Sequence, residues 1–370
     1  MIKNNMKVAI VTCFESNEER CNYLNSFFKE KNYEVDVFTT NFSHIDKQKR
    51  NNIPNGFIPI ETKAYSSNLS FARIMSHINF AKDVFKKIRE KTYDLIYVIA
   101  PANSLIKEAK QYKKDFPDTK IIIDIIDMWP ESLPLKLNKN IFPFNIWRNI
   151  RKNNIDVSDY LVCECDLYRE ILEKEYTKRI KTIYLCKDND VKINKQLDDE
   201  KLTLLYIGSI NNIIDIDKIY HIIKNTNYPV KLHVIGEGEN SKYFIEKLSS
   251  ICELEYHGSI YDNDRKNEIF NKCHAGINIY KDNLYIGLTT KCLDYFMYGL
   301  PIINNIKGDT YKLLNDYDAG INVGDDLKID VDKIIDKAHD YDNIIKMYEN
   351  NFSISKFNEN LAELIDEAMK

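Results

Sequence analysis

IGLTTKCLDYFMYGLPIIN, residues 286–304, is the segment from which the architecture of this chain is most directly inferred. Gly287 comes before a helical pattern that begins with two threonines and runs from about Thr289 to Tyr298. A Gly-Leu-Pro turn then leads into the apolar run Pro301–Asn304. The segment therefore predicts a loop, a helix and a buried strand in succession, which is the repeating unit of a parallel α/β sheet.

The loop of this segment carries hydrogen-bond donors suited to a diphosphate. Backbone N–H groups of Leu288, Thr289 and Thr290 have no partner within a helix that starts there, and the Lys291 ammonium adds a positive charge. Asp294 follows about one turn later, where a carboxylate is placed to hold ribose hydroxyls. The alternative is a capped helix with a solvated lysine, and the spacing alone does not choose between the two.

Apolar runs alternate with helical patterns on both sides of this segment, which indicates βαβ units. In the second half the predicted strands are Leu202–Ile207, Val230–Ile235, Leu254–His257 and Ala275–Tyr280. In the first half they are Met6–Cys13, Glu34–Phe38, Leu95–Ala100, Lys120–Asp127, Tyr160–Glu164 and Ile180–Leu185. A capping box at Ser16-Asn17-Glu18-Glu19 predicts a helix that reaches about Lys31.

The polar, aperiodic stretch Cys186–Lys201 separates the two series and is the expected linker. The fold class predicted is α/β, with two Rossmann-like, doubly wound domains facing a central cleft. The expected bounds are 1–190 and 191–350, with a terminal helix at 351–370 packing back toward the first domain. Ligands of such sheets bind at the carboxyl ends of the strands.

Composition excludes several classes of protein. The 370 residues are 44% hydrophobic and 29% charged, with eight Cys and no C-x-x-C, so a disordered chain, a disulfide scaffold and a zinc ribbon are ruled out. Residues 1–190 carry 31 Lys and Arg against 26 Asp and Glu. This excess of positive charge either favours contact with an anionic partner, such as a membrane surface or a phosphorylated substrate, or reflects ordinary surface variation. No regular basic-aromatic pattern points to nucleic acid. No apolar run approaches the roughly 20 residues of a membrane span, so a cytoplasmic protein is expected.

Gly208, Gly236-Glu237-Gly238, His257-Gly258-Ser259-Ile260 and Asp294-Tyr-Phe-Met-Tyr-Gly-Leu-Pro occur in an order that resembles the C-terminal domain of GT-B fold glycosyltransferases of family 4. The sub-branch it resembles is that of bacterial capsule and exopolysaccharide enzymes. The resemblance implies an N-terminal acceptor domain and a C-terminal domain that binds a nucleotide sugar, with UDP as the expected nucleotide. The donor-binding residues that it implies are Gly208, Ser209, Glu237, Gly258, Ile260, Gly287, Leu288, Thr289, Thr290, Lys291 and Asp294.

Two positions depart from the family pattern. Asp294 falls on the second glutamate of the family's E-x7-E segment, but Ile286 stands at the first, which usually contacts the donor sugar. The family's Arg-x4-Lys pair is also missing, since Ser209 occupies the arginine position. Lys291 is then the first choice to meet the phosphate charge, with Lys281 or Lys307 second.

The first half carries the acceptor-side features of the same resemblance. Asp127-Met128-Trp129-Pro130-Glu131 follows a predicted central strand and is similar to the D-x-W-P-E stretch of the sub-branch. Asp127 and Glu131 are the candidate catalytic carboxylates, to orient the acceptor hydroxyl or take its proton. In the structural alternative, Trp129 packs in the core, Pro130 forms a turn and Glu131 caps a helix. The acceptor-binding candidates are His44, Arg73, His77 and Trp129.

The resemblance further implies a retaining reaction in which the donor phosphate helps to deprotonate the acceptor, with no cofactor and no essential metal. The sequence has no D-x-D at a strand end and no His/Cys cluster of ligand-like spacing, and Asp262-Asn263-Asp264 is expected to cap a helix. The acid-free stretch Leu133–Asn154 mixes basic and large apolar residues. It predicts either peripheral contact with an anionic membrane bearing a polyprenyl-diphosphate-linked acceptor, or packing on its own domain. The competing functions are a non-catalytic glycan-binding subunit and a nucleotide-sugar epimerase.

Overall fold

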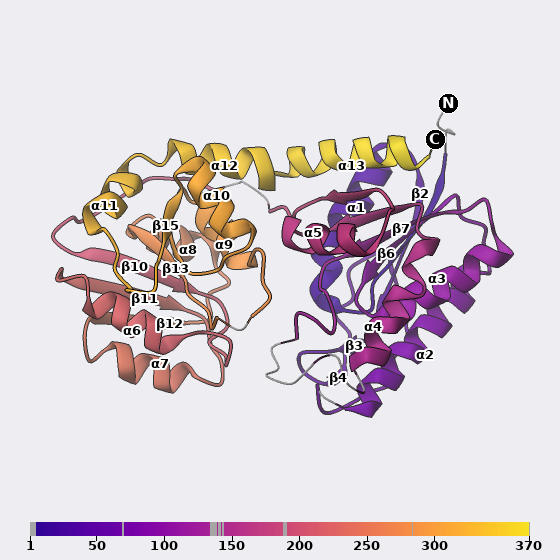
Figure 1. Cartoon of the computed structure of the whole chain (residues 1–370), viewed down its shortest axis with the longest axis horizontal. Coiled ribbons are helices and arrows are strands. Elements are labelled where there is room, and N and C mark those ends of the chain that lie inside the picture. Colours follow the sequence, from indigo (N-terminus) through magenta and orange to yellow (C-terminus); the bar gives the residue numbers. More distant parts are fainter. Residues whose placement is uncertain are drawn as a thin grey trace. The chain divides into compact units, whose positions relative to one another are not determined.

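The computed structural model describes residues 5–68, 70–133, 139, 142, 144–187, 191–282 and 284–369. The chain divides into two compact units, Met1–Tyr184 with Asn358–Lys370, and Leu185–Phe357 (Figure 1). Helix α13 (Ile354–Ala368) begins in the second unit and belongs to the first from Asn358 onward.

The first unit contains a parallel sheet of seven strands in the order β5-β2-β1-β6-β7-β8-β9. These strands are β1 (Lys7–Val11), β2 (Glu34–Thr40), β5 (Phe57–Ile60), β6 (Leu95–Ala100), β7 (Lys120–Ile125), β8 (Tyr160–Cys163) and β9 (Ile180–Thr182). A short antiparallel pair is formed by β3 (Phe42–Ser43) and β4 (Gln48–Lys49). The helices are α1 (Glu18–Glu30), α2 (Phe71–Ile88), α3 (Asn103–Asp115), α4 (Phe144–Lys152) and α5 (Asp166–Glu175).

The second unit contains a parallel sheet of six strands in the order β12-β11-β10-β13-β14-β15. These strands are β10 (Leu202–Ile207), β11 (Val230–Ile235), β12 (Glu253–Gly258), β13 (Ala275–Asn278), β14 (Ile302–Asn304) and β15 (Gly320–Asn322). The helices are α6 (Ile216–Lys224), α7 (Ser241–Leu248), α8 (Asn263–Phe270), α9 (Thr290–Met297), α10 (Asp309–Tyr317), α11 (Val331–His339) and α12 (Asp342–Phe352).

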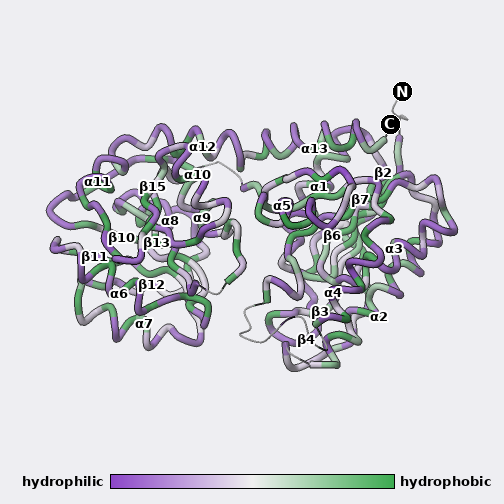
Figure 2. The backbone as a smooth tube through the Cα atoms, viewed as in Figure 1, coloured by the Kyte–Doolittle hydropathy of each residue, from purple (hydrophilic) through white to green (hydrophobic). Residues whose placement is uncertain are grey.

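Each unit is built around its central strands, where hydrophobic residues gather (Figure 2). All six residues of β6 are buried, as expected for a parallel strand covered on both faces. In the second unit, Leu204 of β10 and Leu232 of β11 share one core with Phe244 of α7. Both sheets are parallel and flanked by helices, so the predicted α/β class is confirmed. The carboxyl ends of neighbouring strands are consequently brought to one edge of each sheet.

Side-chain caps begin several helices, and one predicted cap is wrong. Ser70 caps α2 and Asp215 caps α6, each through its side-chain oxygen, and Asp262 caps α8 as predicted. The capping box at Ser16 is wrong, because Glu15–Asn17 forms a 3-10 turn and α1 begins at Glu18 without a side-chain cap. The amide of Asn17 instead donates to Thr12 Oγ1 at 3.1 Å, which ties the turn to the end of β1.

The segment expected to link the two halves lies against the second unit wherever it is described. The backbone N–H of Lys187 donates to Phe352 O, and that of Gln196 donates to Asn271 O. Cys186 is buried. Residues 188–190 of this segment lie outside the described residues.

Candidate functional site

Three neighbouring strands of the second unit end in glycines with positive φ, a backbone conformation that other residues rarely adopt. Gly208, Gly236 and Gly258 have φ values of 112°, 130° and 63°. The N–H of Gly208 donates to Ile235 O at 2.9 Å, and that of Gly236 donates to Gly258 O at 2.8 Å. A Cβ on Gly236 would lie 2.1 Å from Gly208 O, so the strand ends are packed backbone against backbone. Side chains at these positions do not cover the edge where parallel sheets bind ligands.

The loop before α9 presents unpaired donors next to this edge. Thr289 precedes the helix, and its hydroxyl donates to Asn278 Oδ1 at 2.9 Å at the end of β13. Gly287 O accepts two bonds of 3.0 Å from Thr310, which fix the loop to α10. Within the part of the chain that the structure describes, the backbone N–H groups of Leu288, Thr289 and Thr290 donate no hydrogen bond outside the helix. An anion is the natural acceptor for donors at a helix start.

Lys291 is the most informative side chain of the second unit. It is 8% exposed, and its Nζ is buried without a hydrogen-bond partner among the described residues. The ammonium lies over the rings of Tyr206 and Tyr280, at 4.1 and 4.9 Å from their centroids. Burial lowers the pKa of Lys291 to about 7. A Cβ on Gly208 would lie 3.7 Å from Lys291 Cε, so this side chain reaches from α9 to the end of β10.

The other residues predicted to bind the sugar donor differ in whether their side chains already have partners within the protein. Asp294 forms an ion pair with Lys187 through Oδ1, at 2.5 Å. Glu237 is exposed, and its carboxylate accepts from Ser259 N at 3.4 Å. Ser209 O accepts from the buried Tyr206 hydroxyl at 2.8 Å, and Ile260 is buried. Gly208, the Gly287 loop and Lys291 thus lie around one edge of the sheet, whereas Ile260 contributes packing.

The first unit brings all four acceptor candidates into one aromatic cluster. The guanidinium of Arg73 lies 4.6 Å from the Trp129 ring centroid. The His77 ring lies 6.0 Å from the same ring and 5.7 Å from His44. Phe14, at the end of β1, contacts His44, His77 and Trp129 at 4.4, 5.1 and 5.5 Å. Residues far apart in the sequence therefore meet near the carboxyl ends of β1 and β7.

Several polar atoms in this cluster are buried and unpaired. Both ring nitrogens of His77, Nε of Arg73 and Oε2 of Glu15 have no hydrogen-bond partner among the described residues. His44 is held by Cys13 O, 2.7 Å from its Nε2, and by the Tyr65 hydroxyl at its Nδ1. Burial lowers the pKa of His44 to about 4 and that of His77 well below its usual value, so both rings are neutral at pH 7. A neutral imidazole without a partner has a free lone pair that can accept a hydrogen bond, although the lowered pKa makes it a weak proton acceptor.

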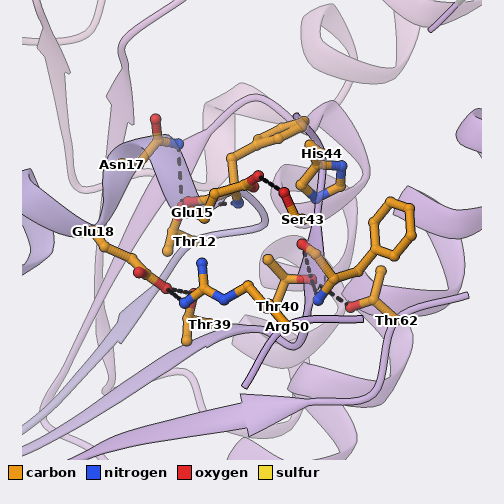
Figure 3. A network of polar contacts seen from close by, with 12 residues as sticks. Thr12, Glu15, Asn17, Glu18, Thr39, Thr40, Ser43, His44, Arg50 and Thr62 are labelled. Atoms are coloured by element: carbon orange, nitrogen blue, oxygen red, sulfur yellow. Dashed lines mark hydrogen bonds and ion pairs between the residues drawn. The ribbon is translucent and has the colours of Figure 1, made fainter. Parts of the chain in front are cut away.

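A polar network holds the loop that carries Phe14 and Glu15 (Figure 3). Glu15 Oε1 accepts from Ser43 Oγ at 3.0 Å and from Ile45 N at 3.1 Å. Glu18 Oε1 accepts from Thr39 Oγ1 at 2.6 Å and pairs with Arg50 at 2.5 Å. Nothing in the sequence spacing indicated that Glu15 and Tyr65 belong to this cluster, because Tyr65 contacts His44 across 21 positions and Glu15 contacts Ser43 across 28.

The two candidate catalytic carboxylates have different surroundings. Asp127 accepts from Trp129 Nε1 at 2.6 Å and from the Ser132 hydroxyl, and burial raises its pKa. Glu131 pairs with Arg148 at 2.7 Å and with Arg151 at 2.9 Å. Burial alone would raise the pKa of Glu131, but the two arginines outweigh it and lower that pKa. Glu131 is thus an ionised carboxylate held by two arginines of α4, whereas Asp127 is hydrogen-bonded to Trp129 of the aromatic cluster.

The basic stretch 133–154 is less exposed than its composition suggests. Arg151 is 1% exposed and is held by Glu131, so it does not belong to an open basic surface. Lys136, Leu135 and Ile141 lie outside the described residues. Phe142 and Ile146 are 74% and 50% exposed. Across the described residues, no helix is both long and apolar enough to cross a bilayer.

Comparison with known proteins identifies the fold. No protein-family model and no curated protein sequence matches the chain. Among solved structures, the chain is similar to the lipopolysaccharide outer core galactosyltransferase WaaB in its apo form. The TM-score is 0.67 at 14% identity, over 98% of this chain and 99% of that one. Anabaena HepE in complex with UDP and glucose aligns with a TM-score of 0.67 at 11% identity, over 98% and 100% of the two chains.

A third structure agrees with these two. AviGT4, a glycosyltransferase involved in avilamycin A biosynthesis, aligns with a TM-score of 0.58 at 11% identity, over 98% of both chains. At these identities the comparison speaks for the fold alone. Two parallel sheets flanked by helices, matched along nearly the whole length of such structures, give this chain the GT-B fold.

Proposed function

We propose that this chain is a retaining glycosyltransferase that moves a sugar from a nucleoside diphosphate sugar, with UDP as the nucleotide, to a growing polyprenyl-linked cell-surface glycan. The observation that carries the proposal is Lys291, a buried ammonium without a partner beside the Gly208 turn. HepE, which is similar in fold, is described in complexes with UDP and with UDP-glucose. The retaining outcome and the capsule or exopolysaccharide context rest on the sequence resemblance.

The donor chemistry follows from the charges at the strand ends of the second unit. A diphosphate leaving group gains negative charge as the glycosidic bond breaks. The Lys291 ammonium and the free N–H groups of Leu288, Thr289 and Thr290 are placed to bind that charge, which is the role a metal ion takes in other enzymes. We infer that the reaction needs no metal. Asp294 is assigned to the ribose hydroxyls, in exchange with its ion pair to Lys187.

The acceptor chemistry is assigned to the aromatic cluster of the first unit. Trp129 and Phe14 offer apolar faces to a sugar ring, and Arg73 offers a guanidinium to a phosphate. Asp127, whose pKa is raised by burial, is suited to receive a proton from the acceptor hydroxyl, and His77, neutral and unpaired among the described residues, is suited to accept a hydrogen bond from it. His44 is assigned to shaping the cluster, since both of its nitrogens are already bonded.

Exposed apolar side chains support a peripheral membrane location on the cytoplasmic side. Ile45, Phe71, Phe142 and Ile146 of the first unit are each at least half exposed, although large apolar side chains are usually covered. Flotation with anionic vesicles tests this location. The double variant Phe142→Ser, Ile146→Ser should lose vesicle binding, whereas Tyr243→Ser, a half-exposed aromatic of the second unit, should retain it. Equal binding by both would contradict the assignment.

The first test is a thermal-shift screen against UDP, GDP, ADP, CMP and NAD, each with and without EDTA. Because a ligand that binds the folded state raises its melting temperature, a shift with UDP alone, unchanged by EDTA, is the expected result. No shift with any nucleotide would contradict donor binding and favour the non-catalytic glycan-binding subunit.

Transfer is tested next, with UDP-sugars and a polyprenyl-diphosphate-linked acceptor in vesicles. Arg73→Ala should abolish acceptor-dependent UDP release while UDP affinity stays unchanged. Arg89→Ala, which removes a guanidinium at the other end of α2 beside Asp115, is the matched control. Conversion of the UDP-sugar to an isomer without UDP release would instead identify an epimerase.

A further inference from the structure

A compact group of metal-ligating side chains lies on the sheet of the second unit. His233 is on β11, and Glu255 and His257 are on the edge strand β12. His233 stands opposite Glu255 in the register, and Glu255 and His257 are two residues apart. Leu232 and Val234 point into the apolar core, so the alternation along β11 places His233 on the opposite face. The three side chains therefore share one face across two hydrogen-bonded strands.

The potential ligand atoms are close to the separations that a metal ion requires. His233 Nδ1 lies 2.9 Å from His257 Nε2. The Glu255 carboxylate oxygens lie 3.6 Å from His233 Nδ1 and 3.9 Å from His257 Nε2. Ligands bonded at about 2.0–2.1 Å in a tetrahedral site are about 3.3–3.4 Å from one another. The observed distances lie on either side of that value, so small side-chain rotations would let all three atoms contact one ion.

Neighbouring residues orient the Glu255 carboxylate and leave one side of the group open to solvent. The Lys231 ammonium lies 3.1 Å from Glu255 Oε2 and holds the carboxylate in place, which is how outer groups orient a ligand. The two imidazole side chains are 6% and 7% exposed, whereas Glu255 is 50% exposed. The site is thus closed on the histidine side and open on the carboxylate side, where an ion can enter and a water can complete the coordination.

Charges from neighbouring elements act in both directions. Glu253 adds a negative charge beside Lys231, at 3.3 Å from its ammonium. Arg265 and Lys272, in and just after α8, add positive charges that repel a cation near His257 and His233, respectively. Two imidazole nitrogens and one carboxylate suit Zn²⁺, Co²⁺ and Ni²⁺ better than Mg²⁺ or Ca²⁺.

We propose that His233, Glu255 and His257 bind a divalent transition-metal ion of the Zn²⁺ class with an open fourth position. The ion joins the edge strand β12 to β11. This site is separate from the glycosyl transfer proposed above, which is assigned no metal, and it does not depend on that proposal. Glu255-x-His257 has the two-residue spacing of a strand face, and its third member comes from another strand, so sequence spacing alone did not indicate it.

The test uses the untagged full-length chain, stripped of metal with a chelator and titrated with Co²⁺ in the absence of nucleotide. One equivalent should produce a visible absorption band that Zn²⁺ then removes, and Zn²⁺ alone should raise the melting temperature. His233→Ala, His257→Ala and Glu255→Gln should each weaken binding by at least about tenfold, since loss even of an outer-shell contact costs 10–100-fold. Glu255→Gln changes a half-exposed side chain and keeps the test valid where a histidine variant does not fold.

Two matched variants locate the site. His221→Ala removes an exposed histidine of α6, and Asp199→Asn alters the carboxylate that lies about 3 Å from both His274 and His339. Both should bind Co²⁺ like the wild type. Absence of a Co²⁺ band in the wild type, unchanged binding in the His233, His257 and Glu255 variants, or loss of the band in Asp199→Asn would each overturn the proposal.

Discussion

Replacing Lys291 by methionine is expected to stabilise the unliganded protein. Burial lowers the pKa of this ammonium from 10.5 to about 7. That difference corresponds to about 5 kcal/mol of unfavourable free energy for the charged side chain in the folded state. The cost is full below pH 7 and disappears as pH rises toward 10.5, because the unfolded chain holds the proton more tightly over that range.

Two aromatic contacts offset part of this cost. The rings of Tyr206 and Tyr280 contribute about 1 kcal/mol each. Lys291→Met should therefore raise the free energy of unfolding at pH 7 by about 2–3 kcal/mol, or the melting temperature by about 5–10 °C. Urea and thermal unfolding at pH 7 measure this directly, and at pH 10.5 the difference between the two proteins should be close to zero.

The same substitution should weaken nucleotide binding. A contact between an ammonium and a diphosphate contributes about 1.5–3 kcal/mol, so the Kd for UDP should rise about 10- to 100-fold. Wild-type affinity should also fall between pH 7 and 9, by up to about tenfold per pH unit, because Lys291 loses its proton there while the phosphate, with a pKa near 6, stays ionised. Calorimetric titrations of Lys291→Met at pH 7, 8 and 9 should give a constant Kd.

Lys195 provides the matched control. Its Nζ is also buried without a partner among the described residues, and burial lowers its pKa to about 8. It lies over the Tyr341 ring, 5.6 Å from its centroid, whereas Lys291 lies over Tyr206 and Tyr280. Lys195→Met should stabilise the protein and leave UDP binding and its pH profile unchanged. Stabilisation of Lys291→Met without loss of UDP affinity would refute the placement of the diphosphate at Lys291.

Three other substitutions test separate parts of the structure. Asp294→Asn should weaken UDP binding about tenfold and leave the Kd for inorganic diphosphate unchanged, since the carboxylate is assigned to ribose; equal loss for both ligands in calorimetry would contradict that role. The buried neutral His44 should cost the first unit up to about 3 kcal/mol as pH falls from 6.5 to 4, because its pKa drops to about 4 on folding. Urea unfolding of His44→Gln should show a smaller pH dependence over this window, and an unchanged slope would argue against it. Gly236→Ala, whose Cβ would lie 2.1 Å from Gly208 O, should lose about 3 kcal/mol or more, whereas Gly56→Ala, with φ +82° and nothing within 4 Å, should lose about 1 kcal/mol. Equal melting temperatures for the two glycine variants would contradict close packing at the strand ends.

The central strands were predictable because they are short, buried and mostly apolar. Leu95–Ala100 and Leu202–Ile207 have the predicted bounds, since each is apolar enough to be covered on both faces of a parallel sheet. The edge strand β15, with only three half-buried residues, has no such run and was not predicted. The strands that could be predicted from the sequence were therefore the buried ones, whatever the intrinsic strand preference of their residues.

Side-chain partners could not be predicted in the same way. The mixed basic and aromatic composition of 133–154 was compatible both with a membrane-facing surface and with packing on its own domain, and Arg151 is buried against Glu131. A charge at a helix position can face solvent or an opposite charge on another element, and the helical period alone does not distinguish these. Glu255 and His257 illustrate the same limit, because His233, which completes their group, comes from a different strand.

The two units share one feature that links the fold to ligand binding. Among the described residues, each leaves buried polar atoms without hydrogen-bond partners near the carboxyl ends of its strands: Lys291 Nζ in the second unit, and Arg73 Nε with both His77 ring nitrogens in the first. Such groups lower stability, because they lose water on folding and gain no hydrogen bond in return. In both units the unpaired set includes a cationic side chain, which suits an anionic ligand. A nucleoside diphosphate sugar and a diphosphate-linked acceptor are two such ligands, so the lack of hydrogen-bond partners in each unit is what the proposed donor and acceptor sites have in common.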